Sequence, residues 1–331
     1  MKTIKNHKGK IVTVTGCGNG DGKTTIAFNL AGYFAKLGLK VLCIDEARNW
    51  NLFQMLTLQY GNVYKNGDSI YIQESRAKDN AIYETIIPDV HVVHRKPLAF
   101  TQRQPEDMEY RKLVKRKFEM YCEDYDIIIR DTGYVEKIGT YVDEGKSGYS
   151  SYATFFMNVS VISNFTVIPY LSYDGIEGNN AILMAKYGTN NPKWEEMYEK
   201  EKVLIVPFGV MPIPYKSIYK CMLNTRKELV EKEETKKLLG ESLDQEDMVN
   251  KNYINASIEI YTDVILHDDK KAIDAERRTH IPTTLNGRKS VFSEDIDKLC
   301  HRVEDRVWSI SKAEQKMRNE FLYRKLNKNA Q

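Results

Sequence analysis

The chain has 331 residues, of which 42% are hydrophobic and 29% are charged, and its net charge is +3. This composition is typical of a soluble globular protein. No apolar run approaches the roughly 18 residues that a membrane-spanning helix needs. The basic N-terminal segment leads straight into the first expected strand, so we expect no signal peptide.

The cysteines and the distribution of charge narrow the class of protein and its compartment further. The five cysteines are scattered and form no CxxC pair, which argues against a disulfide framework and a zinc site and favours a reducing cytoplasm. Residues 311–331 hold six Lys or Arg against two Glu, a net charge of +4, and the rest of the chain then carries −1. The basic character therefore lies at the C-terminal end.

The first elements in chain order form a strand, a glycine-rich loop, a helix and a second strand. The β-branched run Ile11–Thr15 predicts the first strand, apolar residues at helical spacing predict a helix over Lys23–Lys36, and Lys40–Ile44 predicts a strand that ends at Asp45. This order is the context in which a loop ending in Gly-Lys-Thr is a P-loop. The sequence therefore predicts a nucleotide site.

Each residue type in the loop suits phosphate binding. Glycines allow the backbone to wrap round a triphosphate with its N–H groups pointing inward, and the helix N-terminus adds positive charge. Lys23 would neutralise the β- and γ-phosphates, and the Thr24 hydroxyl would bind Mg²⁺. The residues expected at the nucleotide are Gly18, Asn19, Gly20, Asp21, Gly22, Lys23, Thr24 and Thr25.

One feature of the loop departs from the strict motif. The glycine expected six residues before the lysine is replaced by Cys17, with Gly16 beside it. An ordinary glycine-rich turn without a ligand is the alternative interpretation.

The middle of the chain continues the alternation of strands and helices. A polar stretch over 60–88 predicts an irregular excursion or a small hairpin, and a helix is expected to start near Pro105. An apolar strand follows and ends at Asp131, before a glycine-rich loop over 134–150. The other elements predicted here are a strand at Val90–His94, a strand at Val159–Tyr170 and a helix from Ser172 to about Tyr187.

The last third is predicted to contain two strands and two helical segments. The strands are Lys202–Val206, which ends in Pro207, and Ile258–Leu266, the last in the chain. Charged helical sequence fills 215–240. A long amphipathic helix runs from Glu294 with Ser293 as its cap.

This alternation predicts an α/β fold: a single doubly wound, mostly parallel sheet with helices on both faces. No linker divides the chain, so we expect one domain over 1–331, with insertions near 60–88 and 134–150 and a basic helical end at 294–331. Ligands bind at the carboxyl ends of such strands, where Gly16, Asp45 and Asp131 fall.

Four residues at strand ends complete the candidate site. Asp131 and Asp45 are expected to contact Mg²⁺ or its waters, although each could instead cap a helix. Pro207 and Phe208 follow a strand that should end near the base of the nucleotide. Phe208 could stack on that base, or it could pack in the core.

Several of these motifs together resemble the ParA/MinD family of P-loop ATPases. GCGNGDGKTTIAFNLAGYFAKLGLKVLCID is similar to the family's P-loop, first helix and second strand, and YDIIIRDTG is similar to its Walker B strand. ILHDDKKAIDAERRTHIP resembles the family's last strand and the helix beyond it. The resemblance implies ATP and Mg²⁺ as cofactors, catalytic roles for Lys23, Asp45 and Asp131, and a cytoplasmic, ATP-dependent homodimer.

The chain departs from the family at two positions. Gly18 stands where the family has a second lysine that reaches the partner's nucleotide, and Ala47 stands where a second aspartate positions the attacking water. Glu46 is not expected to replace that aspartate, because neighbouring side chains at a strand end point to opposite faces. We therefore expect ATP binding with slow hydrolysis. Pilus-positioning members of the Tad type also depart from the standard P-loop.

The resemblance implies a switch that positions or partitions DNA or a membrane, pilus or conjugation apparatus through a protein cargo or adaptor. An ATP-dependent metabolic ligase on the same fold and a nucleotide-binding scaffold without turnover are the alternatives. The basic C-terminal end, with Arg277, Arg278, Arg288 and Lys289, is a candidate for non-specific DNA binding, or else a solvated or packed surface. Membrane binding is the least expected, because Arg318, Asn319 and Arg324 interrupt the apolar face of the tail.

Overall fold

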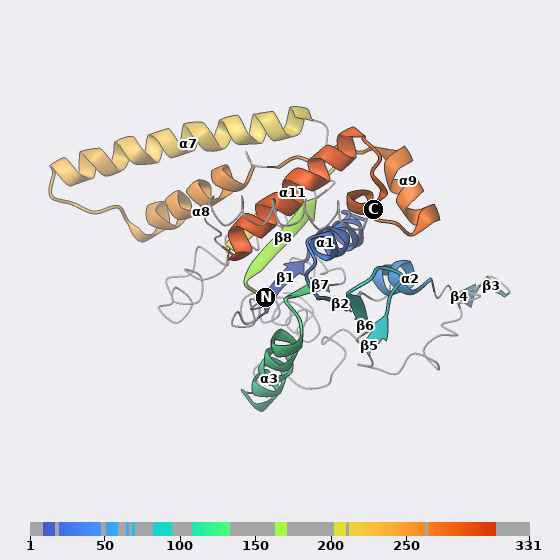
Figure 1. The fold of residues 1–331 in the computed structure, drawn as a ribbon. Coiled ribbons are helices and arrows are strands. Elements are labelled where there is room, and N and C mark those ends of the chain that lie inside the picture. The colour runs from blue at the N-terminus through green and yellow to red at the C-terminus, as the bar shows by residue number, and fades with distance from the viewer. Residues whose placement is uncertain are drawn as a thin grey trace.

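The computed structural model describes residues 9–16, 20–47, 51–58, 64–65, 68–69, 82–94, 108–132, 163–170, 202–209, 212–261 and 264–308. Its centre is a twisted sheet with strand order β5-β6-β2-β7-β1-β8-β9 (Figure 1). The strands are β1 (Lys10–Val14), β2 (Val41–Asp45), β5 (Ile82–Glu84), β6 (Val90–His94), β7 (Ile127–Asp131), β8 (Phe165–Tyr170) and β9 (Lys202–Pro207). All neighbours pair in parallel except β5, which lies antiparallel to β6 at one edge.

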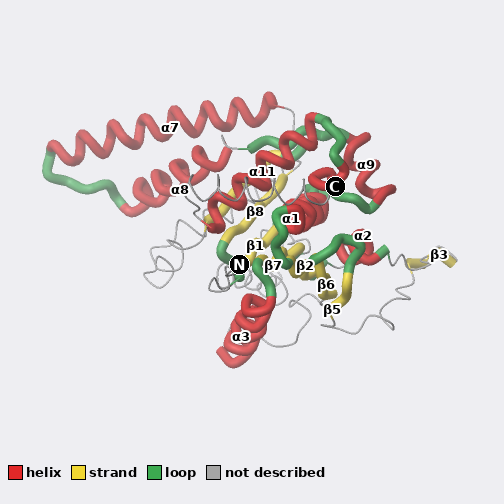
Figure 2. The backbone as a smooth tube through the Cα atoms, viewed as in Figure 1, coloured by secondary structure: helices red, strands yellow, loops and turns green. Residues whose placement is uncertain are grey.

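Helices cover both faces of this sheet, as the sequence predicted (Figure 2). The larger core lies on the face covered by α1 (Lys23–Lys36), α2 (Asn51–Thr57) and α11 (Val291–Trp308). A smaller core lies on the opposite face, under α3 (Met108–Asp124), and includes Phe118 and Ile128. The strands read as continuous apolar runs because both faces are buried. The predicted doubly wound α/β class is confirmed.

The C-terminal part adds elements beyond the β9 edge of the sheet and on the α1 face. They are α7 (Pro212–Leu238), α8 (Gln245–Tyr261), α9 (Lys270–Thr279) and α10 (Thr283–Asn286). α7 and α8 form an antiparallel helical hairpin that projects from the body (Figures 1 and 2). α10 packs on α1 through Gly32, where a Cβ would lie 2.7 Å from Cγ of Pro282.

Two predictions about the C-terminal third were wrong. Residues 258–261 are the last turn of α8, and Leu266 contributes only an isolated bridge to Phe208. Ile254 and Ile258 are both buried, and their four-residue spacing is that of a helix face, which outweighs the β-branched composition that suggested a strand.

The second error concerns the cap of α11. Its cap is Ser290, not Ser293: the Ser290 hydroxyl accepts the Ser293 N–H, and the Ser293 hydroxyl accepts the Ser290 N–H in return. This reciprocal pair is a capping box, which the sequence contains as two serines three residues apart.

The sequence also missed α2 and the edge strand β5. The 60–88 segment contains the short antiparallel pair β3 (Tyr64–Lys65) and β4 (Asp68–Ser69), in keeping with the hairpin alternative, before β5 joins the main sheet. The predicted loop at 134–150 and the predicted helix at 172–187 lie outside the described residues, and so does the basic tail 311–331. The expected single domain stays a prediction.

Candidate functional site

The predicted loop connects β1 to α1 at the carboxyl end of the sheet. Gly20 and Gly22 have φ angles of 84° and 86°, which side chains rarely adopt, and α1 begins at Lys23. Gly18 and Asn19 lie outside the described residues. Lys23 and Asp21 are buried, and the Thr25 carbonyl accepts a hydrogen bond from the Asn29 amide at 3.0 Å.

Phe208 packs against this loop at Gly22. It is 5% exposed, and a Cβ on Gly22 would lie 3.1 Å from its ring. The same ring meets Phe292 edge to face, with 6.0 Å between the ring centroids. Pro207 ends β9 beside Tyr170 of β8. The position of Phe208 favours the packing role, because its ring is enclosed by the core and the loop.

Thr24 and Asp131 meet at the start of α1. The Thr24 hydroxyl donates to Oδ2 of Asp131 at 2.7 Å. Asp131 is 1% exposed, and its Oδ1 has no hydrogen-bond partner among the described residues. Burial raises the pKa of Asp131 to about 6, against the lowering effects of the Thr24 hydrogen bond and the Lys23 charge. A carboxylate oxygen in this position suits a divalent cation or its water.

Asp45 lies beside Asp131 in the register of β2 and β7, but it is engaged differently. Its Oδ2 accepts the Phe53 N–H and its Oδ1 accepts the Ala47 N–H, each at 2.9 Å. Burial and the neighbouring Asp131 charge raise the pKa of Asp45, and these backbone hydrogen bonds oppose the shift. Asp45 therefore holds the first turn of α2 and fixes the position of Ala47, so the expected capping alternative describes its observed contacts.

A buried ion pair that sequence reasoning missed lies on the other face of the same strands. Arg130 Nη2 and Glu46 Oε2 are 2.7 Å apart, and both side chains are almost fully buried. The Arg130 guanidinium also lies 5.0 Å from the Phe118 ring of α3. Glu46 thus points away from Asp45, as alternation requires. An arginine inside an apolar strand, one residue before its terminal acid, was the available signal.

A second missed network joins the loop helix α1 to the C-terminal helices. The Asn29 amide donates to Oε1 of Glu276 at 2.8 Å, and the Thr283 N–H donates to the same oxygen at 2.6 Å. Thr284 completes the network through its N–H, which donates to Oδ1 of Asn29 at 3.2 Å. Glu276 is 1% exposed, and burial raises its pKa. This network fixes α9 and α10 against α1.

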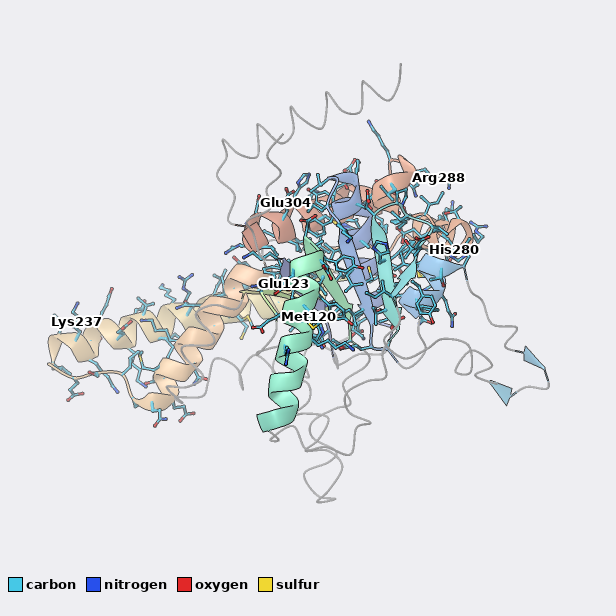
Figure 3. The ribbon with its side chains drawn as sticks, turned by 60° about the horizontal axis from the view of Figure 1, so that its bottom comes forward. Met120, Glu123, Lys237, His280, Arg288 and Glu304 are labelled. Atoms are coloured by element: carbon cyan, nitrogen blue, oxygen red, sulfur yellow. The ribbon has the colours of Figure 1, made fainter. Side chains whose placement is uncertain are left out.

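The basic residues proposed from the sequence lie on the surface of α9 and directly after α10. Arg277 and Arg278 on α9 and Arg288 and Lys289 beyond α10 are all exposed, and Arg288 projects from the body in Figure 3. Their side chains therefore can meet a partner, but the basic tail that accompanied them in the prediction lies outside the described residues.

The described residues contain no group of three or more His, Cys, Asp or Glu that could hold a metal ion. No described helix is both long and apolar enough to cross a membrane.

Comparison with known proteins gives two matches in sequence. Residues 9–139 match the family model described as an AAA domain. The chain is also 26% identical over 137 residues to a putative replication protein A of Rhizobium rhizogenes, and the match covers 37% of this chain and 34% of that protein. The chain thus spans about a third of the length of this curated relative.

Solved structures show the fold over most of the chain. MinD of Pyrococcus furiosus matches with a TM-score of 0.51 and 14% identity, covering 90% of this chain and 99% of its own. The McdA–ATP complex from Cyanothece matches with a TM-score of 0.50 and 16% identity, covering 93% and 99%. MinD of Pyrococcus horikoshii complexed with Mg-ADP has a TM-score of 0.50 and 13% identity, covering 92% and 99%.

The raised pKa of Asp131 predicts how stability depends on pH without ligand. A carboxyl whose folded pKa exceeds its unfolded value binds more protons when folded, so stability falls as pH rises between about 4 and 6. Asp131→Asn, which removes this charge, should be more stable than wild type at pH 8, with the difference shrinking toward pH 4. Urea unfolding across this range measures it. A difference in unfolding free energy that does not change with pH would contradict the raised pKa of Asp131. Asp126→Asn, directly before β7, is the control.

Proposed function

We propose that this chain is a P-loop protein of the ParA/MinD family and an ATP-binding switch that partitions or positions DNA or a protein apparatus, in keeping with the matched family model and the shared fold. The observation that carries the proposal is the contact between Thr24 and Asp131 at the start of α1, with one buried oxygen of Asp131 left unmatched. Together with the loop of Gly20 and Gly22, it supports a site for a nucleotide phosphate and a divalent cation.

The residues present fit Mg²⁺ and ATP. In the proposal, Thr24 and Asp131 hold the cation directly or through water, Lys23 neutralises phosphate charge, and the loop amides bind phosphate oxygens. The cation would supply charge neutralisation during phosphoryl transfer. The McdA structure with ATP and the MinD structure with Mg-ADP are compatible with this ligand choice for the present fold.

Hydrolysis is proposed to be slow. Ala47 has no side chain that could orient water, and Asp45 is committed to the backbone of Ala47 and α2. Glu46 cannot compensate, because it binds Arg130 on the opposite face. The presence or absence of bound nucleotide would therefore set the state of the switch. In the proposal the protein is a cytoplasmic homodimer, and a partner protein recognises its nucleotide-bound state.

Nucleotide binding is tested by Lys23→Ala. Wild type should be stabilised against thermal unfolding by Mg-ATP, by roughly 2.7 kcal/mol at about 100 times the dissociation constant, and the variant should lose this effect. Lys36→Ala, at the other end of α1, is the matched control and should retain it. If wild type shows no stabilisation, or if Lys23→Ala is stabilised equally, the nucleotide site is wrong.

Slow hydrolysis is tested by restoring the two missing side chains. Gly18→Lys with Ala47→Asp should raise ATP turnover, since a single well-placed transition-state donor is typically worth about 10²–10³ in rate. Turnover per subunit and Mg-ATP affinity are measured together, because a lysine at position 18 could strain the loop and weaken binding. Unchanged turnover with intact affinity would show that these positions do not limit hydrolysis, and a fast wild-type enzyme would contradict the proposal directly.

A further inference from the structure

The hairpin of α7 and α8 is held together on one side and exposed on the other. Met222 and Leu229 of α7 are buried on the inner side. Lysine–carboxylate contacts then tie α7 to α8 and to the connection before it. Lys232 contacts Asp247 and Asp244, Lys236 contacts Asp244, and Lys251 contacts Glu233. The hairpin projects away from the sheet, and Lys237 marks its far end in Figure 3. The inner face of α7 therefore already has its contacts within the same chain.

The outer side of α7 carries a stripe of apolar and charged side chains. Residues at 223, 227, 230, 234 and 238 share one face, because their spacings are three or four. Leu223, Val230 and Leu238 are 38%, 37% and 88% exposed. Lys227 and Glu234 lie between them and are also exposed. We call these five residues the α7 stripe.

The order of residues in the α7 stripe is self-complementary. If two copies of α7 lie antiparallel with the twofold axis between positions 230 and 231, Leu223 faces Leu238 of the other copy. In the same register Lys227 faces Glu234 of the other copy. The two Val230 side chains lie on either side of the axis, each level with Glu231 of the other copy. Each contact away from the axis occurs twice, as an isologous twofold interface requires. No residue of the stripe faces a like charge in this arrangement.

We propose that the α7 stripe is a homotypic docking surface, which pairs the hairpin with that of a second copy of this chain. The charge pattern favours this occupant. Residues 212–261 contain eight basic and nine acidic residues, so the hairpin has no excess of positive charge with which to attract DNA or an anionic membrane. Because it projects from the body, antiparallel pairing leaves the two bodies at opposite ends.

The expected association is weak. In this register only residues 223–238 of the two α7 helices overlap, a length of about 24 Å, so the pair buries less area than the standard stable interface of about 1,600 Å². The contact between Lys227 and Glu231 within one helix, 3.8 Å between highly exposed groups, is too weak to hold Lys227 away from a partner. The pairing is therefore concentration-dependent, and it needs no nucleotide.

Sedimentation velocity of the full chain tests the proposal without ATP and in the Lys23→Ala background. This background removes any nucleotide-dependent dimer, so failure here and failure of the proposed function are distinguishable. The chain with Lys227 and Glu234 unchanged should shift from monomer to dimer between low and high micromolar concentration. Lys227→Glu and Glu234→Lys should each weaken this association by about tenfold, since each creates two like-charge contacts.

Two combinations make the test specific. The double variant Lys227→Glu/Glu234→Lys should regain association, and an equimolar mixture of the two single variants should form a mixed dimer. Glu228→Lys, which makes the same charge change as Glu234→Lys off the stripe, should leave association unchanged. The proposal is overturned if the chain stays monomeric at all concentrations, if Glu228→Lys is as disruptive as Glu234→Lys, or if the double variant is not rescued.

Discussion

Two carboxylates at the ends of adjacent parallel strands set the chemistry of this end of the sheet. Asp45 and Asp131 occupy matching positions in β2 and β7, both are buried, and each has a pKa raised by burial. Two such charges are unfavourable together in a poorly solvated site. Asp45 accepts a hydrogen bond from the backbone of α2, and Asp131 accepts one from Thr24. The other oxygen of Asp131 has no hydrogen-bond partner among the described residues, which suits the proposed cation.

The surrounding elements hold this arrangement in place. Phe208 supports the loop under Gly22, the Asn29–Glu276 network fastens α1 to the C-terminal helices, and the Arg130–Glu46 pair fixes the other face of the same strand ends. Removing one member of a buried ion pair is strongly destabilising. These contacts would preorganise the proposed site for phosphate and metal, whereas Ala47 has no polar side chain with which to activate water in it. The homotypic hairpin surface would add a second twofold contact, and two different twofold contacts can link dimers into open chains.

The sequence predicted the elements whose signals are local. Helix α1 and the strands ending in Asp45 and Asp131 follow from apolar runs and terminal acids, and the structure has all of them. The structure describes the predicted P-loop from Gly20 onward. The strand expected at Ile258–Leu266 failed because β-branched composition cannot distinguish a buried strand from a helix that packs every fourth residue. α2 was missed because its N-terminus is capped by Asp45, a residue distant enough in sequence that no local capping pattern is visible. The contacts of Arg130, Glu276 and Phe208 depend on tertiary packing, and one sequence does not contain their partners' positions.

Metal dependence of nucleotide binding is the most direct test of this account. The affinity of the full chain for a fluorescent ATP analogue is measured by titration with excess Mg²⁺ and again with the metal chelated, for wild type and for Asp131→Ala. The account predicts that chelation and Asp131→Ala each weaken binding, and that their effects are not additive, because both remove the same cation contact. Equal affinity with and without Mg²⁺, or the full effect of chelation in Asp131→Ala, would contradict the claim that Thr24 and Asp131 form a cation site.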